Sequence, residues 1–405
     1  MSKRRYRISC RFILCFLLLN SSFHDASGTG KTNRAGLDVL RRTTPEEAGF
    51  DGKKLSLVDT IIMQAVQDTA FPGAVLLVAR NGMVVHHRAY GRFEYGLNAQ
   101  IVDTNTIYDL ASLTKVIATT NACMRLIDEG KLRLHDRVVK YLPGFGRMGK
   151  RKITLYNLLV HNSGLPGWLP LYQSCPTPYS LLDSIYSTEL AYPTGSATVY
   201  SDLGFIVLGK IIETVSRKSL DRYVDSVFFA PLGMTSTMFN PPLSIIQKIA
   251  PTEIDTLRDN SGRPMRGRVH DENAGFLGGV SGHAGVFSTA HDVAIILEMI
   301  RNGGHYNGKR FLRESTLARF IKRQSSKSTR ALGWDTKRTE RSWAGTILSE
   351  RTFIHTGFTG TSVVVDPRRG IIIVFLTNRV CPSRENMKIN TIRPEVHDAI
   401  LSAMK

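Results

Sequence analysis

Cysteine is scarce in this chain, which has five in 405 residues, and tryptophan is scarcer, with three. Cys10 and Cys15 lie in the amino-terminal segment, so only Cys123, Cys175 and Cys381 remain for the folded part. These three are far apart, their spacing is not that of a zinc site, and they cannot all pair with one another. The sequence therefore excludes a disulfide-rich scaffold and predicts buried apolar thiols, with or without one disulfide.

Several other signals are missing. No later segment approaches the ~20 apolar residues of a membrane-spanning helix, and no internal repeat or low-complexity stretch occurs. Neither metal-binding histidine spacing nor a nucleic-acid-binding module is present, so we expect no metal, no cofactor and no nucleic-acid partner. The glycine-rich run 303–309 resembles a phosphate-binding loop, but Arg310 replaces the required serine or threonine, which favours a simple turn.

The amino terminus is typical of an export signal. Residues 1–28 combine a basic opening, an apolar run over residues 12–19 and small residues at 26–28. Eight apolar residues are too few for a stable membrane span, which needs about 20. We therefore expect an extracytoplasmic protein, periplasmic or secreted, with a membrane tether if the signal is not cleaved.

Positive charge is abundant. Lysine and arginine number 53 against 34 aspartate and glutamate, a formal net charge of +19. Such a surface attracts polyanions, which for an exported protein are anionic lipid headgroups or acidic cell-wall polymer. We expect a weak attraction to membrane or cell-wall surfaces of this kind.

Strand patterns occur near both ends of the chain. β-branched apolar runs at 73–79 and 84–90 flank Asn81-Gly82, a dipeptide suited to a tight hairpin turn. A second pair of runs, 361–365 and 371–377, flanks a turn at 366–370. The pattern predicts an α+β fold in which an antiparallel sheet is built from both chain ends and flanked by helices.

Helical patterns fill the rest of the chain. We predict helices from Thr44 to residue 66, over 203–215, after a cap at Thr289, and over 393–404 with Pro394 in the first turn. The predicted domains are a signal peptide (1–28), an α/β sheet lobe and an inserted, mostly helical lobe with site-lining loops. The sheet lobe comprises residues 29–115 and 280–405, and the helical lobe residues 116–279.

Ser112-Leu113-Thr114-Lys115 is the first candidate for chemistry. Residues three apart on a helix share a face, so the Lys115 amine can lie beside the Ser112 hydroxyl and accept its proton. The spacing alone is weak evidence, since Ser402-Ala403-Met404-Lys405 repeats it at the carboxyl end. Alone, the pattern also fits a helix-start hydroxyl beside a solvated lysine.

Two further segments contain residue types that such a site requires. In Tyr200-Ser201-Asp202 the tyrosine hydroxyl could relay a proton, and Asp202 could hold the lysine or a substrate amide. The simpler interpretation is a packed tyrosine before a helix-capping aspartate.

The second segment is His355-Thr356-Gly357-Phe358, at the start of the carboxyl-terminal hairpin. Gly357 permits close approach by a ligand, and a following backbone N–H can serve as an oxyanion donor. His355 could bind a substrate carboxylate or assist proton transfer. Alone, the segment also fits an edge-strand turn with an exposed histidine.

Together the three segments resemble the serine β-lactamase and penicillin-binding protein superfamily, because they occur in the order of its signature motifs. The resemblance is greatest to the branch of class C β-lactamases, D-alanyl-D-alanine carboxypeptidases and esterases, and it extends over nearly the whole mature chain. It implies a β-lactamase/transpeptidase-like fold in which Ser112 is acylated, Lys115 is its base and Tyr200 relays a proton. It also implies an oxyanion hole formed by the N–H groups of Ser112 and Phe358.

Two positions depart from the family pattern. Asp202 stands where the family often has asparagine; an ionised aspartate cannot donate to a substrate carbonyl and favours a protonated Lys115. His355 stands where lysine is frequent, and it keeps only partial positive character for a carboxylate. Thr356 and Gly357 complete the predicted substrate-binding strand.

The segment from His270 to Gly285 is rich in glycine. It resembles a stretch of some exported family members, and we interpret it as a site-lining loop. His270 and His283 are therefore further candidates for substrate contact.

These patterns predict an exported serine hydrolase that acts through an acyl-enzyme. The resemblance implies a D-alanyl-D-alanine carboxypeptidase-like or penicillin-binding protein, with a peptidoglycan stem peptide or a small acyl compound as substrate. An esterase or a class C-like β-lactamase is the alternative within the same chemistry. An alternative of another class is a catalytically silent protein that binds cell-wall or peptide ligands.

Overall fold

The computed structural model describes residues 39–337 and 342–405, so the predicted signal peptide lies outside the described residues. In this described part, no helix is both long and apolar enough to cross a membrane. Cys123, Cys175 and Cys381 are all buried and free. Of the two alternatives for the thiols, the structure has the one without a disulfide.

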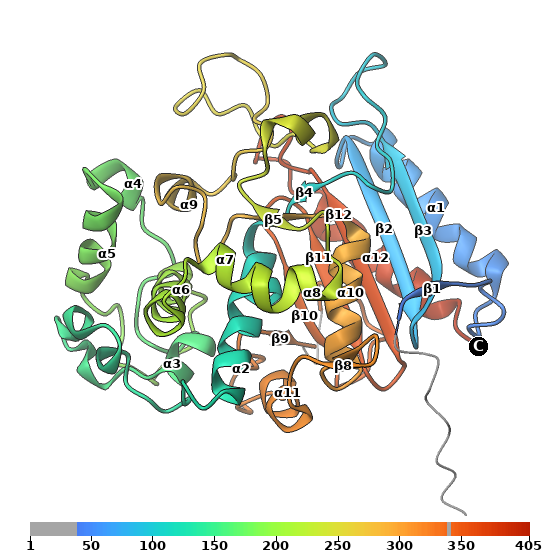
Figure 1. Cartoon of the computed structure of the whole chain (residues 1–405). Helices are drawn as coiled ribbons and strands as arrows, with labels where there is room; N and C mark the ends of the chain where they lie inside the picture. Colours follow the sequence, from blue (N-terminus) through green and yellow to red (C-terminus); the bar gives the residue numbers. More distant parts are fainter. Residues whose placement is uncertain (1–38, 338–341) are drawn as a thin grey trace, which may run out of the picture. The chain divides into compact units, whose positions relative to one another are not determined.

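Seven strands form the main sheet, in the spatial order β1-β3-β2-β12-β11-β10-β9 (Figure 1). β1 pairs with β3 in parallel, and every other neighbouring pair is antiparallel. The two chain ends meet where β2 pairs with β12, which confirms the predicted α+β fold. The strands are β1 (Arg41–Arg42), β2 (Gly73–Arg80), β3 (Met83–Gly91), β9 (Asp335–Thr336), β10 (Phe353–Thr356), β11 (Ser362–Asp366) and β12 (Ile371–Thr377).

Both predicted hairpins are present. Asn81 and Gly82 have φ values of 50° and 79°, the left-handed conformation that a tight turn between β2 and β3 requires. Residues 367–370 link β11 to β12. The glycine-rich run 303–309 forms part of a small hairpin, β7 (His305–Tyr306) and β8 (Lys309–Arg310), as expected of a turn.

Twelve α-helices accompany the strands in the described part of the chain. They are α1 (Gly52–Gln67), α2 (Thr120–Asp128), α3 (Leu155–Leu159), α4 (Leu171–Ser174), α5 (Pro178–Ser187), α6 (Asp202–Ser216), α7 (Leu220–Val224), α8 (Ala230–Leu232), α9 (Glu272–Phe276), α10 (Ala290–Arg301), α11 (Glu314–Ile321) and α12 (Ile389–Ser402).

The sheet is covered on both faces because its strand residues alternate between two cores. Leu77 of β2 packs in the core that includes Ile296 of α10. Its neighbour Leu76 packs in a second core with Val58 of α1 and Val396 of α12. Successive side chains of a strand point to opposite faces, so α10 lies on one face and α1 with α12 on the other (Figure 1). The lobe boundaries at 115/116 and 279/280 stay a prediction.

Two predicted helix boundaries are wrong. α1 begins at Gly52 rather than Thr44, because Asp51 caps it by accepting the Lys54 N–H at 3.1 Å. α12 begins at Ile389, so Pro394 lies inside the helix rather than in its first turn. Ile389 is buried in the core, and its packing stabilises the extra turn ahead of the proline.

A second, three-stranded sheet brings the site segments together. β4 (Tyr108–Asp109) pairs with β6 (Val286–Ser288), which also pairs with β5 (Met238–Phe239). β4 leads directly into the Ser112 segment, and β6 follows the glycine-rich loop that contains His283. The pairing of these two strands therefore places that loop beside the candidate nucleophile.

Candidate active site

Ser112 lies in a tight helical turn, Ala111–Leu113 (η1), directly after β4. Ala111 has a φ of 46°, a left-handed conformation that costs a residue with a side chain about 1–3 kcal/mol. Asp109 holds this turn, because its carboxylate accepts the N–H of Ala111 at 2.8 Å and that of His270 at 2.6 Å. Asp109 belongs to no motif by which the sequence could indicate this role.

Gly357 allows the nucleophile segment to lie against the end of β10. A Cβ atom at this position would be 2.3 Å from the Leu110 carbonyl oxygen. The Thr361 hydroxyl donates to the same carbonyl at 3.1 Å. The predicted close approach at Gly357 is therefore made by the chain itself, two residues before Ser112.

Lys115 is fully buried and points at the serine. Its Nζ lies 3.0 Å from Ser112 Oγ, 3.0 Å from the His283 carbonyl oxygen and 2.6 Å from Asp202 Oδ1. Lys115 donates to the His283 carbonyl and to Ser112 Oγ, and it forms an ion pair with the Asp202 carboxylate.

The charge of Lys115 follows from these contacts. Burial disfavours the ammonium, but the Asp202 carboxylate and Tyr200 outweigh it and hold the pKa of Lys115 above its usual value. The lysine is thus an ammonium at neutral pH, as expected from an aspartate at position 202. To accept the Ser112 proton, Lys115 must first release one, and Asp202 is an acceptor within hydrogen-bonding distance.

Tyr200 is the third residue of the site, beside Ser112 and Lys115. Lys115 Nζ lies 4.9 Å from the centre of the Tyr200 ring, and Lys115 and Ser112 both act to lower the pKa of the Tyr200 hydroxyl. Burial raises the pKa of Tyr200 even though Lys115 opposes it, so the phenol is neutral. A neutral phenol in contact with both groups can pass a proton from one side of the site to the other.

The segment around Tyr200 is fixed by His161, which the sequence analysis did not single out. His161 Nδ1 accepts the Ser201 N–H at 3.0 Å, and its ring centroid lies 4.6 Å from that of Tyr200. Burial holds the pKa of His161 well below its usual value, so the ring is neutral. Ser201 caps α6 in place of the aspartate considered above, and Asp202 becomes the first helical residue.

His355 differs from the expectation of partial positive character. Its Nδ1 lies 2.9 Å from the Thr356 carbonyl oxygen, which can only accept, so Nδ1 carries the proton. Burial, together with the cations Lys115 and Arg330, lowers the pKa of His355 to about 3. The imidazole is neutral at pH 7, and its buried Nε2 has no hydrogen-bond partner among the described residues.

Two cavities meet at the nucleophile, and Ser112, Tyr200 and Phe358 line both. The first, the arginine cavity, has a volume of about 380 Å³. Its charged and polar lining comprises, besides Ser112 and Tyr200, the residues Arg330, Asp335, His355, Thr356, Arg379, Asn390 and Arg393. The second, the acidic cavity, has a volume of about 350 Å³ and is lined by Trp168, Asp202, His270, Asp271, Glu272 and Arg384.

Arg330 is the partly exposed arginine of the arginine cavity, whereas Arg379 and Arg393 are buried. Its Cζ lies 5.2 Å from the centre of the Tyr200 ring, and its Nη1 is 3.8 Å from Asp335. Arg379, by contrast, donates to backbone carbonyls, that of Phe358 among them. No motif surrounds Arg330, so the sequence did not indicate it as a site residue.

The structure brings all the predicted site residues to these two cavities or to the residues that line them. Thr356 and Gly357 line the arginine cavity, and His270 lines the acidic cavity. His283 lies behind Asp271, with Nε2 2.8 Å from the carboxylate, and reaches Lys115 only through its backbone carbonyl.

Comparison with known proteins decides the family. A family model described as Beta-lactamase matches residues 58–396. The chain belongs to the beta-lactamase family. Curated proteins similar to this chain include one from Salmonella typhimurium named "Putative D-alanyl-D-alanine carboxypeptidase". It is 35% identical over 388 residues, which cover 87% of this chain and 89% of the relative.

Solved structures similar to this beta-lactamase family member show the same fold. EstCE1, described as a hydrolase with promiscuous acyltransferase activity, has a TM-score of 0.69 at 26% identity, covering 86% of this chain and 99% of its own. A penicillin-binding protein homologue from Caulobacter crescentus has a TM-score of 0.70 at 18% identity, covering 88% and 99%. The family resemblance and the β-lactamase/transpeptidase-like fold predicted from the sequence are thus confirmed.

Proposed function

We propose that this protein is an exported serine hydrolase that works through an acyl-enzyme on Ser112, with D-alanyl-D-alanine carboxypeptidase-like activity. The observation that carries the proposal is the 3.0 Å contact between the buried Lys115 amine and Ser112 Oγ, with the centre of the Tyr200 ring 4.9 Å from the same amine. The name of the 35% identical relative supports a terminal D-alanine as the leaving group.

In the proposed reaction, Lys115 passes a proton to Asp202 and takes the proton of Ser112 as Oγ attacks the carbonyl carbon. The N–H groups of Ser112 and Phe358 then stabilise the oxyanion. Ser112 lies in the first turn of a helical segment, where N–H groups have no intrahelical acceptor. Tyr200 relays the proton to the leaving amine, and water later releases the acyl group from Ser112.

The arginine cavity supplies the positive charge for the terminal carboxylate of the substrate. His355 is neutral, so Arg330 takes the role that the sequence gave to this histidine. A planar guanidinium binds a carboxylate through two parallel hydrogen bonds. His355 then contacts the substrate as an acceptor through Nε2, beside Thr356 and Gly357.

Replacing Arg330 tests this assignment. We expect Arg330→Gln to raise KM for a D-alanyl-D-alanine peptide about tenfold or more, because a charge-assisted bidentate contact is lost. A tenfold change corresponds to ~1.4 kcal/mol. With a nitrophenyl ester, which has no carboxylate for Arg330 to bind, Arg330→Gln should react within about twofold of the wild-type rate. Arg310→Gln, on the exposed hairpin β7–β8, is the matched control. Equal KM values for Arg330→Gln and wild type would contradict the assignment.

An esterase is the second candidate, favoured by the 26% identity to EstCE1, and a class C-like β-lactamase uses the same nucleophile. Fold and nucleophile do not determine the acyl donor. A catalytically silent cell-wall or peptide binder is the alternative outside enzyme chemistry. We place the protein outside the cytoplasm, tethered to the membrane if the signal is not cleaved, with a weak attraction to anionic surfaces from its net charge of +19.

Two active-site probes separate these candidates. Fluorescent penicillin and a fluorophosphonate should both label wild type and Ser402→Ala, whose Ser-x-x-Lys match ends α12, but not Ser112→Ala. Labelling by the fluorophosphonate alone would favour the esterase. Absence of Ser112-dependent labelling by either probe would contradict the proposed hydrolase activity and favour the catalytically silent binder.

A further inference from the structure

The acidic cavity has a surplus of negative charge beside the nucleophile. Asp202, Asp271 and Glu272 line it, with side chains only 12–19% exposed. Asp202 is paired with Lys115, and Asp271 with His283. These contacts fix the carboxylates in place at the wall of a cavity that opens on Ser112.

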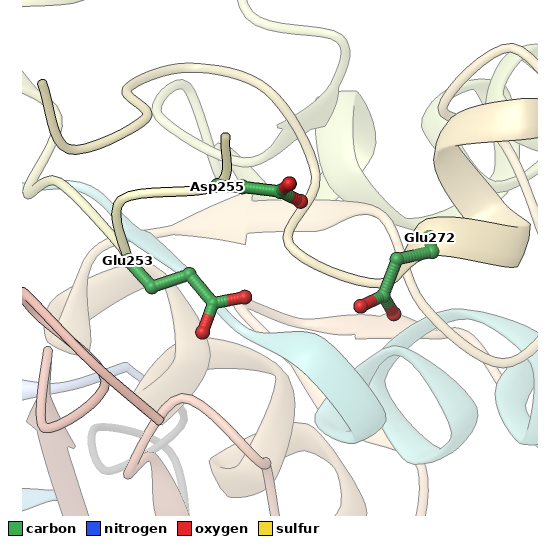
Figure 2. Close-up of side chains that lie close together, drawn as sticks. All are labelled: Glu253, Asp255 and Glu272. Atoms are coloured by element: carbon green, nitrogen blue, oxygen red, sulfur yellow. The ribbon is translucent and has the colours of Figure 1, made fainter. Parts of the chain in front are cut away.

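Behind Glu272 lie two more carboxylates, Glu253 and Asp255, and Figure 2 shows the three turned toward a common space. One carboxylate oxygen from each of the three residues lies within 4.8 Å of the other two. Each already has a cationic partner, because Arg384 bonds to Glu253 and Glu272, and Arg258 bonds to Asp255. Arg384 joins two of the three carboxylates, so we interpret the cluster as a salt-bridge network, in which Arg384 contacts only Oε1 of Glu272.

Counting both layers, five carboxylates share three cationic side chains, Lys115, Arg258 and Arg384. His270 and His283 lie among them, each with one ring nitrogen near a carboxylate. The arginine cavity has the opposite balance, three arginines to Asp335. The net charge of the cavity lining therefore changes from negative to positive between the two cavities that meet at Ser112.

Two aromatic side chains, Trp168 and Phe358, line the acidic cavity. Trp168 is 42% exposed and Phe358 is 49% exposed, unusual for such large apolar rings. The Phe358 ring is already covered by the guanidinium of Arg379 at 4.6 Å and by His270 at 5.5 Å. Trp168 remains as an accessible ring beside the carboxylates, the combination that binds organic ammonium groups.

We propose that the acidic cavity binds a cationic amine on the acyl part of the substrate, through Glu272, Asp271 and the Trp168 ring. The inference rests on the proposed function, in which the arginine cavity holds the carboxylate of the leaving residue. The acyl part must then enter the other cavity. The substrate class is a peptide with a carboxylate on the leaving residue and a free amine on the acyl side of the scissile bond.

Two peptides that differ by one acetyl group test the proposal. Nα-acetyl-lysyl-D-alanyl-D-alanine has a free side-chain ammonium, and its Nα,Nε-diacetyl analogue has none. The assay measures D-alanine release. We expect kcat/KM to be about tenfold or more higher for the peptide with the free amine than for its diacetyl analogue. Glu272→Gln and Trp168→Leu should each cut this preference to below about threefold, since each removes part of the ammonium site. The matched control Glu314→Gln, at an exposed position on α11, should keep it.

The outcomes separate this inference from the proposed function. Hydrolysis of both peptides at equal rates, or faster hydrolysis of the diacetyl peptide, would overturn the ammonium site and leave the carboxypeptidase standing. A preference that survives in both Glu272→Gln and Trp168→Leu would place the amine elsewhere and also overturn it. If neither peptide releases D-alanine while Ser112 still reacts with the fluorophosphonate, the peptide substrate fails and this inference falls with it.

Discussion

The ion pair between Lys115 and Asp202 fixes the resting charge of the candidate active site. Removing a buried carboxylate leaves an uncompensated ammonium, which deprotonates rather than remain charged without a partner. Burial is the largest influence on the pKa of Lys115 and lowers it, whereas Asp202 is the largest that raises it. In the Asp202→Asn variant the pKa should therefore fall.

The pH profile of the Asp202→Asn variant tests this. In wild type, a site that has lost the Lys115 proton to solvent needs no prior transfer to Asp202, so kcat/KM rises as pH passes through the pKa of Lys115. We expect the rise to shift to lower pH by at least about one unit in Asp202→Asn, a change of ~1.4 kcal/mol in the ionisation. Asp183→Asn, which removes an exposed carboxylate paired with Arg147, should leave the profile unchanged. An unshifted profile in Asp202→Asn would contradict the role of the ion pair.

Single residues differ in how far the sequence could predict them. Ser112, Lys115 and Tyr200 belong to motifs, so their order along the chain indicated one site. Arg330 and His161 have no motif, and each meets Tyr200 only through tertiary packing. The charge of His355 could not be predicted either, because its pKa depends on burial and on Lys115 and Arg330, which only the fold brings near it.

At the level of elements, the site depends on the contact between α6 and the loop that contains His283. Gly209 of α6 lies against Gly282, and a Cβ on Gly209 would lie 2.9 Å from the Gly282 backbone nitrogen. Gly204, on the same helix, has room, since its Cβ would meet Leu158 at an ordinary 3.6 Å. The two glycines form a matched pair for substitution.

We expect Gly209→Ala to lower the free energy of unfolding by about 1–3 kcal/mol, because backbone must move. Activity should fall as well, since the displaced loop carries the His283 carbonyl away from Lys115. Gly204→Ala should be neutral or stabilising by up to about 1 kcal/mol through helix propensity. Urea unfolding and D-alanine release measure both effects. Similar results for the two variants would contradict the close-packing argument.

Elements with strong local signals were predictable, as the hairpin at Asn81-Gly82 shows. Boundaries determined by tertiary contacts were not. The extra turn of α12 ahead of Pro394 forms because Ile389 packs in the core. The sequence around Ser112 predicted a helix start, and the chain is helical there, although Ala111–Leu113 forms a 3₁₀ turn and Lys115–Thr119 a π-helical turn before α2. That geometry depends on Asp109 and on the β10–β11 turn.

For the whole molecule, buried neutral histidines predict sensitivity to mild acid. Burial lowers the pKa of both His355 and His397 to about 3. The unfolded chain binds these protons near pH 6.5 and the folded chain does not, so stability falls as pH drops below 6.5. By pH 5 each histidine should cost about 2 kcal/mol.

Urea unfolding at pH 7.5 and pH 5 measures this loss. Carboxylates such as Glu253, whose pKa Arg384 and His270 lower to about 2 against the effect of burial, stabilise the fold until pH falls below 4.5. These carboxylates therefore contribute little to the change in stability between pH 5 and 6.5. His397→Gln should reduce the loss, whereas the exposed His135→Gln should not. Equal stability of wild type at both pH values would contradict the prediction.

The most direct test of the account is to trap the covalent intermediate on Ser112. The protein is mixed with a D-alanyl-D-alanine peptide, quenched in acid, digested and analysed by mass spectrometry. We predict that the peptide containing Ser112 gains the mass of the acyl group with loss of one D-alanine, and that Ser112→Ala shows no adduct. Release of D-alanine by Ser112→Ala at the wild-type rate, or an adduct on another residue, would contradict the central claim.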